Sequence, residues 1–181
     1  MPKKALGPQT WIFPMPALLI GALVEGKPNF MTAAWGGIAC AEPRLVSVAV
    51  RSMRLTLAGI RDKKTFSINI PSTTLADKVD FCGVHSGKKT DKSQTFTVFY
   101  GKDKTVPLID ECPCVHECRV ERLVELGTHV LVIGEIMETH VDESCLKDDR
   151  PDIAALDPLI YLPGVQRYYD VGREIRKAFS S

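Results

Sequence analysis

The sequence has almost no excess of charge of either sign. Its 181 residues include 23 Lys and Arg against 22 Asp and Glu, which leaves a net charge of +1. Proteins that bind nucleic acids or anionic membrane surfaces usually show a basic excess or a basic stripe. The composition therefore predicts neither partner, and any basic residue with a functional role is expected to act locally.

The sequence also lacks a long hydrophobic run. Its longest apolar stretch, residues 14–24, falls far short of the roughly 20 residues that cross a bilayer. Residues 1–10 have neither the apolar region nor the cleavage site of a secretory signal. We therefore predict a cytoplasmic protein with no membrane partner, whose six cysteines are free thiols rather than disulfides. The length suits a single domain over residues 1–181.

Two common nucleotide-binding motifs are missing. Residues 21–28 approach the sequence of a phosphate-binding P-loop, but Pro28 stands where the motif needs a hydroxyl side chain for magnesium. We interpret this stretch as a hairpin turn. No GxGxxG sequence occurs, so a Rossmann dinucleotide site has no support either.

Short apolar segments separated by turn residues dominate the chain. Alternating or β-branched residues predict strands at residues 17–24, 30–40, 45–51, 65–70 and 128–141, the first two forming a hairpin. Helical spacing predicts short helices at residues 53–62, 72–80 and 170–179. Strands outnumber helices, and no regular βαβ alternation appears. The predicted fold class is therefore mostly β with short helices, in a closed or partly closed antiparallel barrel.

Residues 112–118 place three thiols and an imidazole close together in the sequence. Cys112, Cys114, His116 and Cys118 are suitable residue types for zinc and would share one face of an extended strand. Ligands spaced in this way along one strand do not converge easily on a tetrahedral ion, and free cysteine is a common small buried residue. We favour structural thiols and predict no metal site, with a zinc-binding module at residues 112–118 as a remote alternative.

Five segments together resemble the flavin reductase-like family with an FMN-binding split barrel, and most closely its flavoredoxin branch. They are residues 14–21, residues 26–35 (GKPNFMTAAW), residues 48–56 (VAVRSMRLT), residues 66–72 (FSINIPS), and residues 80–87 (DFCGVHSG) with Asp91 and Lys92. Each segment is weak alone, but their order and spacing are specific. The resemblance implies an antiparallel Greek-key split β-barrel with its core at about residues 14–165. It also implies a homodimer with residues 166–181 at the interface.

The cofactor that the resemblance implies is FMN, whose flat ring needs an apolar wall with a few placed polar groups. Ala33 and Ala34 permit close backbone approach, Trp35 offers an aromatic face, and Asn29 and Thr32 offer side-chain hydrogen bonds. An ordinary strand with a core tryptophan is the alternative for this stretch. With the resemblance we favour the flavin site. The predicted ring-binding residues are Asn29, Phe30, Met31, Thr32, Ala33, Ala34 and Trp35.

The phosphate of FMN needs cations and hydrogen-bond donors. Arg51 and Arg54 lie where a predicted strand meets a predicted helix, so their side chains and the helix N–H groups can converge on an anion. A solvated strand end is the alternative for Arg51. A glycine-containing turn at residues 86–92 brings further donors, while Lys88 and Lys89 are expected to be exposed. The remaining predicted cofactor-binding residues are Val50, Ser52, Thr56, Cys82, Ser86, Gly87, Lys92 and Tyr168.

No Ser-His-Asp group or carboxylate pair stands out, so no catalytic residue is predicted. A bound flavin would itself accept hydride or electrons, and the protein would bind and orient it. Two functions stay open. We favour an NAD(P)H-dependent flavin oxidoreductase. The alternative is a non-enzymatic FMN electron carrier that exchanges electrons with a redox protein. In the homodimer that the resemblance implies, Tyr168 and Tyr169 of a partner chain would cover the flavin, with core packing or solvent exposure as the alternatives for these two tyrosines.

Overall fold

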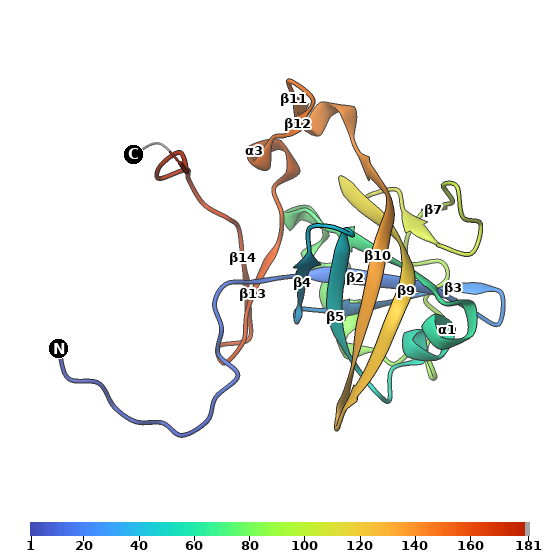
Figure 1. Cartoon of the computed structure of the whole chain (residues 1–181), viewed down its shortest axis with the longest axis horizontal. Coiled ribbons are helices and arrows are strands. Elements are labelled where there is room, and N and C mark those ends of the chain that lie inside the picture. The colour runs from blue at the N-terminus through green and yellow to red at the C-terminus, as the bar shows by residue number, and fades with distance from the viewer. Residues whose placement is uncertain (180–181) are drawn as a thin grey trace.

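The computed structural model describes residues 1–179. Its main element is a seven-stranded antiparallel sheet that curls into a split barrel, with the strand order β3-β2-β6-β9-β10-β5-β4 (Figure 1). The predicted fold class is therefore confirmed. The strands are β2 (Leu18–Val24), β3 (Lys27–Ala33), β4 (Gly36–Cys40), β5 (Leu45–Arg51), β6 (Thr65–Ile70), β9 (Cys114–Leu126) and β10 (His129–Val141).

β3 and β4 follow each other in the chain but lie at opposite ends of the strand order. The predicted hairpin is formed by β2 and β3, around a turn in which Glu25 and Gly26 have φ of 51° and 80°. The chain then crosses to the other edge, where the Ala49 N–H donates to the Trp35 carbonyl at 2.8 Å. The prediction of one strand over residues 30–40 is wrong, because this crossing separates two strands.

Two hydrophobic clusters hold the barrel together. Alternate residues of the strands fill its interior, including Ile20, Val48, Val50 and Phe66, all at or near zero exposure. Burying one such side chain stabilises the fold by about 1.5–3 kcal/mol. The second cluster uses the alternate positions of β2 and β3 and lies beneath α2 (Ala76–Val84) and residues 96–112.

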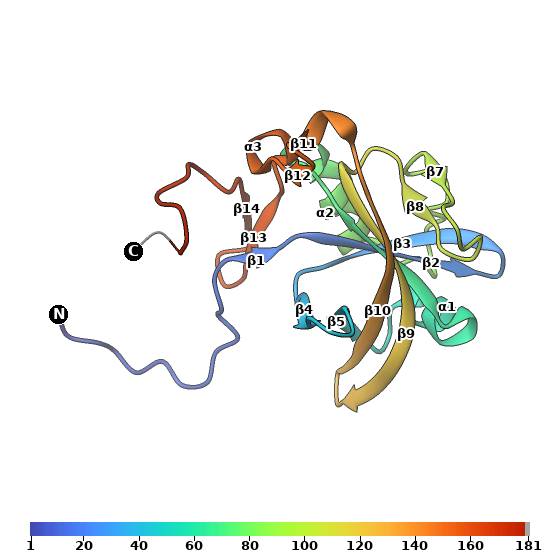
Figure 2. The ribbon, with the colours of Figure 1, turned by 45° about the horizontal axis from the view of Figure 1, so that its top comes forward.

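Helix α1 (Leu55–Lys63) packs beside β2 and contributes Leu57 and Ile60 to the interior cluster (Figure 2). It ends at Lys64, which has a left-handed conformation and donates its N–H to the Ile60 carbonyl. Arg61 and Lys63 in the last turn complement the helix dipole. The helices predicted at residues 53–62 and 72–80 thus exist with shifted ends.

Short elements complete the chain. A separate three-stranded sheet, in the order β1-β13-β14, lies beside the barrel on the side where both termini lie (Figure 2). The Trp11 ring packs against Gly164, whose φ is +88°. The bounds are β1 (Met15–Pro16), η1 (Thr73–Leu75), β7 (Val98–Phe99), β8 (Leu108–Ile109), η2 (Glu143–Cys145), β11 (Leu146–Lys147), β12 (Arg150–Pro151), α3 (Ile153–Leu156), β13 (Ile160–Leu162) and β14 (Arg167–Tyr169).

The helix predicted at residues 170–179 is wrong. Residues 171–177 have no regular structure, and Val171, Ile175 and Phe179 are all exposed. Helical spacing alone does not hold a short helix in water without a surface for its apolar face. Within residues 1–179, no helix is long and apolar enough to cross a membrane.

Candidate functional site

Two arginines and a histidine meet where three elements end. Arg51 ends β5, Arg54 precedes the first turn of α1, and His129 begins β10 directly opposite Arg51. They border a cleft of about 130 Å³, the arginine cleft. No carboxylate forms an ion pair with either arginine among residues 1–179. The lining residues are Met31, Thr32, Ala33, Ala34, Trp35, Ala49, Arg51, Arg54 and His129.

The arginine cleft is electrostatically positive. Burial lowers the pKa of Arg54, and the Arg51 charge lowers it further. Burial and then the Arg51 charge also lower the pKa of His129. Arg54 is held in place by a 2.6 Å hydrogen bond from its guanidinium to the Gly83 carbonyl, in the last turn of α2. An anion that entered the cleft would meet two cations and no competing carboxylate.

Residues 32–34 form the wall between this cleft and a second, larger hollow of about 500 Å³, the tyrosine pocket. The Thr32 hydroxyl donates to the Val79 carbonyl, so this side chain is turned toward α2. No Lys or Arg side chain lines the pocket within the described residues. The lining residues are Ala17, Thr32, Ala33, Ala34, Asp80, Gly83, Val84, Tyr161, Gln166 and Tyr168.

The tyrosine pocket takes its name from Tyr161 and Tyr168, whose ring centroids are 5.5 Å apart. The Tyr168 hydroxyl donates to Asp80 Oδ1 at 3.2 Å. Burial, followed by the Asp80 charge, raises the pKa of Tyr168, so its phenol stays protonated at neutral pH. The structure places Tyr168 in the pocket of its own subunit, so a partner chain is not needed to bring it to residues 32–34.

Trp35 lies at the rim of the arginine cleft. Its ring stacks on His129 at a centroid distance of 4.7 Å and an interplanar angle of 27°, and the residue is 39% exposed. The alternative of a core tryptophan is therefore wrong. One face of the ring therefore lies against His129, and the residue also lines the arginine cleft.

Several predicted residues turn their side chains into the core. Phe30, Met31, Val50 and Cys82 belong to the two hydrophobic clusters, so only their backbone groups are available to a ligand. Asn29 and Thr56 are buried as well, and the Asn29 amide donates to the Thr56 hydroxyl at 2.7 Å. This bond ties β3 to α1. Ser52 is exposed and bonds the Thr128 carbonyl through its backbone N–H and its hydroxyl.

The loop at residues 86–92 lines a separate hollow of about 300 Å³ together with Asn29. Gly87 packs so closely that a Cβ there would lie 2.4 Å from Asn29 Oδ1. Ser86 accepts the Lys88 N–H at 3.3 Å. Lys92 is buried and lines neither the arginine cleft nor the tyrosine pocket. The loop is close to the predicted site, but the Lys92 ammonium is directed inward, toward the Phe30 and Cys82 carbonyls.

The sequence interpretation missed residues on both sides of the wall. His129 faces Arg51 through the register of β10 on β5, while Asp80 and Gly83 reach the tyrosine pocket from α2 and Tyr161 reaches it from β13. The family motifs include Asp80 and Gly83 but give them no role. Neither the strand register nor the position of Tyr161 has a local signal in the sequence.

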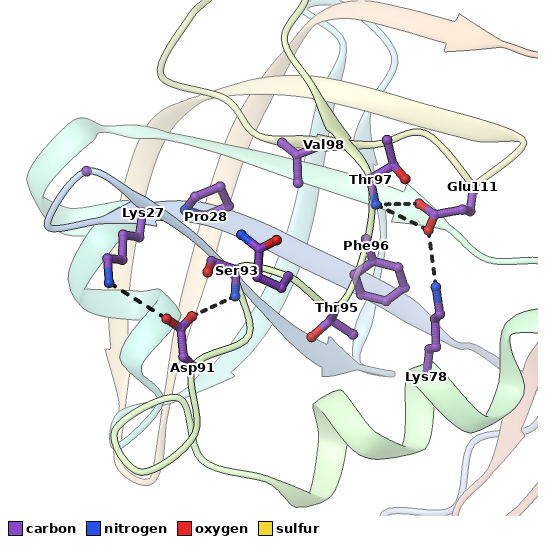
Figure 3. Close-up of a pocket in the computed structure, with 12 residues that line it drawn as sticks. Lys27, Pro28, Lys78, Asp91, Ser93, Thr95, Phe96, Thr97, Val98 and Glu111 are labelled. Atoms are coloured by element: carbon purple, nitrogen blue, oxygen red, sulfur yellow. Dashed lines mark hydrogen bonds and ion pairs between the residues drawn. The ribbon is translucent and has the colours of Figure 1, made fainter.

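A wide polar groove of about 860 Å³ lies apart from the arginines, beside α2 and residues 91–98 (Figure 3). Its cations are matched by anions: Lys78 pairs with Glu111 at 3.1 Å, and Lys27 with Asp91 at 3.7 Å. Lys78 also lies over the Phe96 ring, 5.1 Å from its centroid. Because these charges already have partners, the groove is less suited to a phosphate than the arginine cleft.

The three thiols considered for zinc do not converge. Cys118 belongs to the interior cluster and Cys112 to the second cluster, while Cys114 packs in a third, smaller cluster with Cys145 and Leu156. Within residues 1–179 all six cysteines are free, and no group of three or more His, Cys, Asp or Glu side chains is placed to hold a metal. The interpretation as separate core thiols fits this arrangement.

Comparison with known proteins gives consistent matches over nearly the whole chain. The sequence profile described as "Flavin reductase like domain" matches residues 11–170. An uncharacterized protein of Archaeoglobus fulgidus is 38% identical over 146 residues, which are 79% of this chain and 81% of that protein. Flavoredoxin from Methanosarcina acetivorans is 37% identical with a TM-score of 0.97, over 100% of this chain and 97% of that chain. Flavoredoxin of Desulfovibrio vulgaris (Miyazaki F) is 39% identical with a TM-score of 0.92, over 99% and 98%.

Proposed function

Because the chain belongs to the flavin reductase like domain family, we propose that it binds FMN and transfers a hydride or electrons through it. The observation that carries the proposal is the pair of unlike hollows on residues 32–34. One holds two arginines without a carboxylate partner among the described residues, and the other has no basic side chain. FMN has the same two halves, a dianionic phosphate and a flat ring.

The roles follow from the chemistry of each wall. Arg51 and Arg54 would hold the phosphate, because guanidinium groups bind phosphate oxygens in pairs. The small Ala33 and Ala34 would let the ring approach the backbone closely, and Tyr168, whose hydroxyl donates to Asp80, would offer its aromatic ring as a neighbour. When bound, FMN supplies the redox chemistry, and the protein supplies binding, orientation and the electrostatic surroundings.

We further propose that the electron donor is NADH or NADPH. The tyrosine pocket leaves space without basic side chains beside residues 32–34, where a nicotinamide ring would find aromatic and apolar neighbours. The second candidate is an electron carrier that receives electrons from a redox protein. Its support is the similarity to two proteins called flavoredoxins.

The test starts from the visible spectrum of the purified protein, before and after reconstitution with FMN. We expect a yellow protein that binds FMN in a 1:1 ratio. Anaerobic mixing with NADPH or NADH then separates the two candidates. Rapid loss of the flavin absorbance supports the oxidoreductase, while an unchanged spectrum supports the carrier. A protein that stays colourless and does not bind added FMN contradicts the proposal.

We also propose a homodimer. β4 is an edge strand whose outward residues are exposed, with Ile38 at 74%. An edge strand with an exposed apolar residue is a ready surface for a second chain. Light scattering after gel filtration should give twice the chain mass of 20.0 kDa. A mass of one chain at micromolar concentration would contradict it.

A further inference from the structure

Lys92 is a buried cation in the long loop that follows α2. The residue is only 2% exposed. Its ammonium donates to the Phe30 carbonyl at 3.1 Å and to the Cys82 carbonyl at 2.9 Å. No carboxylate among residues 1–179 forms an ion pair with it. Burial is the main cause that lowers the pKa of Lys92.

Each of the two carbonyls stands at a place where the backbone lacks a regular partner. Phe30 belongs to β3, which pairs on one side only. Cys82 lies in the last turn of α2, where helix carbonyls have no intrahelical donor. Arg54 takes the next carbonyl, that of Gly83. Two cations therefore cap the C-terminal end of α2, in agreement with its dipole.

The two bonds of Lys92 also reach both sides of the tyrosine pocket. Phe30 is two residues before Thr32 on one wall, and Cys82 is directly before Gly83 on the other. The ammonium thus joins β3 to the end of α2, while the Thr32 hydroxyl joins β3 to Val79 earlier in the same helix. Burying a charge without a counter-ion is unfavourable. A buried charge of this kind is expected where it has a role, and here the ammonium joins the two walls of the pocket.

We propose that Lys92 is a positioning residue for the flavin ring: its bonds to Phe30 and Cys82 hold the two walls of the tyrosine pocket at the separation that accepts the ring. Lys92 does not contact the phosphate, which belongs to Arg51 and Arg54. The inference rests on the proposed FMN function and changes the role that the sequence motifs suggest for this lysine. Its effect is therefore on the ring half of the ligand.

The test compares FMN with riboflavin, which has the ring but no phosphate. Dissociation constants of both are measured on flavin-free protein by quenching of flavin fluorescence. We expect Lys92→Met to weaken both ligands by the same factor, about tenfold, as for the loss of one well-placed contact. Arg51→Gln should weaken FMN by about tenfold and leave riboflavin unchanged. Lys89→Met, a matched change of an exposed lysine in the same loop, should change neither.

Each other pattern overturns the inference. If Lys92→Met weakens FMN alone, Lys92 is a phosphate ligand. If it changes neither dissociation constant, Lys92 only caps backbone carbonyls. If the wild-type protein binds neither ligand, the proposed FMN function fails as well, whereas binding of both with an unchanged Lys92→Met variant leaves that function intact.

A measurement on the wild-type protein covers the case in which Lys92→Met does not fold. The nitrogen resonance of the Lys92 ammonium is followed by NMR during titration with inorganic phosphate. We expect the Arg51 guanidinium resonances to shift with phosphate while that of Lys92 stays in place. A Lys92 shift that tracks the Arg51 shift overturns the inference.

Discussion

Two loops are tied to the barrel by a buried charge, one around Glu117 and the other around Lys92. Glu117, at 1% exposure, accepts the N–H groups of Asp103 at 2.9 Å and Lys102 at 3.2 Å. His140 Nε2 lies 2.8 Å from the same carboxylate. Lys92 is just as buried, but its partners are two neutral carbonyls. The carboxylate has an ionisable partner, and the ammonium has none within the described residues.

This difference distinguishes the Glu117 region, which we interpret as structural, from the Lys92 region, which we interpret as functional. A buried charge that is paired and fully hydrogen-bonded stabilises one conformation and leaves no field for a ligand. An uncompensated buried cation adds to the positive potential around it. Lys92 shares that neighbourhood with Arg54: burial is the main cause that lowers the pKa of Lys92, and the Arg54 charge also lowers it. Basic side chains without a carboxylate partner among the described residues therefore distinguish the candidate site better than the size of a hollow does.

The largest effect is expected from removing Glu117, the buried charge that has partners. Glu117→Ala leaves the Lys102 and Asp103 N–H groups and the His140 side chain without their acceptor, so we expect the free energy of unfolding to fall by about 3 kcal/mol. Urea denaturation at pH 7, followed by circular dichroism, measures this change. Glu121→Ala, on an exposed position of the same strand, should stay within about 0.5 kcal/mol of wild type. FMN affinity should be unchanged in both, and a large loss of FMN binding in Glu117→Ala would contradict the separation of the two regions.

Each of the two regions has a closely packed glycine, and an alanine substitution at each glycine tests the same difference. A Cβ at Gly101 would lie 1.9 Å from Glu117 Oε1, so Gly101→Ala should lower the unfolding free energy by about 2 kcal/mol without changing FMN affinity. A Cβ at Gly87 would push on Asn29, which bonds Thr56. Gly87→Ala should therefore weaken FMN by roughly tenfold with a smaller loss of stability.

The control is Gly37, where a Cβ would meet nothing within 4 Å. Gly37→Ala should leave both stability and FMN affinity close to wild type. Equal effects of Gly87→Ala and Gly101→Ala on both measurements would show that the two loops are not distinct in function.

The sequence predicted the architecture better than the electrostatics. Alternating apolar residues located β2, β5 and β6, because side-chain period is a local property. The family motifs placed Arg51 and residues 32–34 in one neighbourhood. His129 could not be assigned, because its position opposite Arg51 depends on the register of two distant strands.

Lys92 is the clearest example of a residue whose environment could not be predicted from the sequence. It follows Lys88 and Lys89 in a polar loop, and only the family resemblance set it apart from these two exposed lysines, as a cofactor ligand and not as a buried residue. The difference arises from where the loop crosses β3 and α2, which is a tertiary property. The helix predicted at residues 170–179 failed for the same kind of reason, because its apolar spacing meets no surface within the described residues.

The smallest expected effect is a dependence of the Glu117 region on acid. Burial by itself raises the pKa of Glu117, but the hydrogen bonds from the Asp103 N–H, His140 and the Lys102 N–H together lower it below the usual 4.5. A carboxyl whose pKa is lower in the folded state stabilises the protein above its unfolded pKa and loses that contribution as the pH falls through its folded value. The gap in unfolding free energy between wild type and Glu117→Ala should therefore be full at neutral pH and narrow below about pH 4.5. Urea titrations of both proteins from neutral to acid pH measure the gap. The gap in unfolding free energy should not close entirely, because a protonated Glu117 still fills its space beside Gly101. A gap that widened toward acid would contradict the assignment of Glu117 as the stabilising charge.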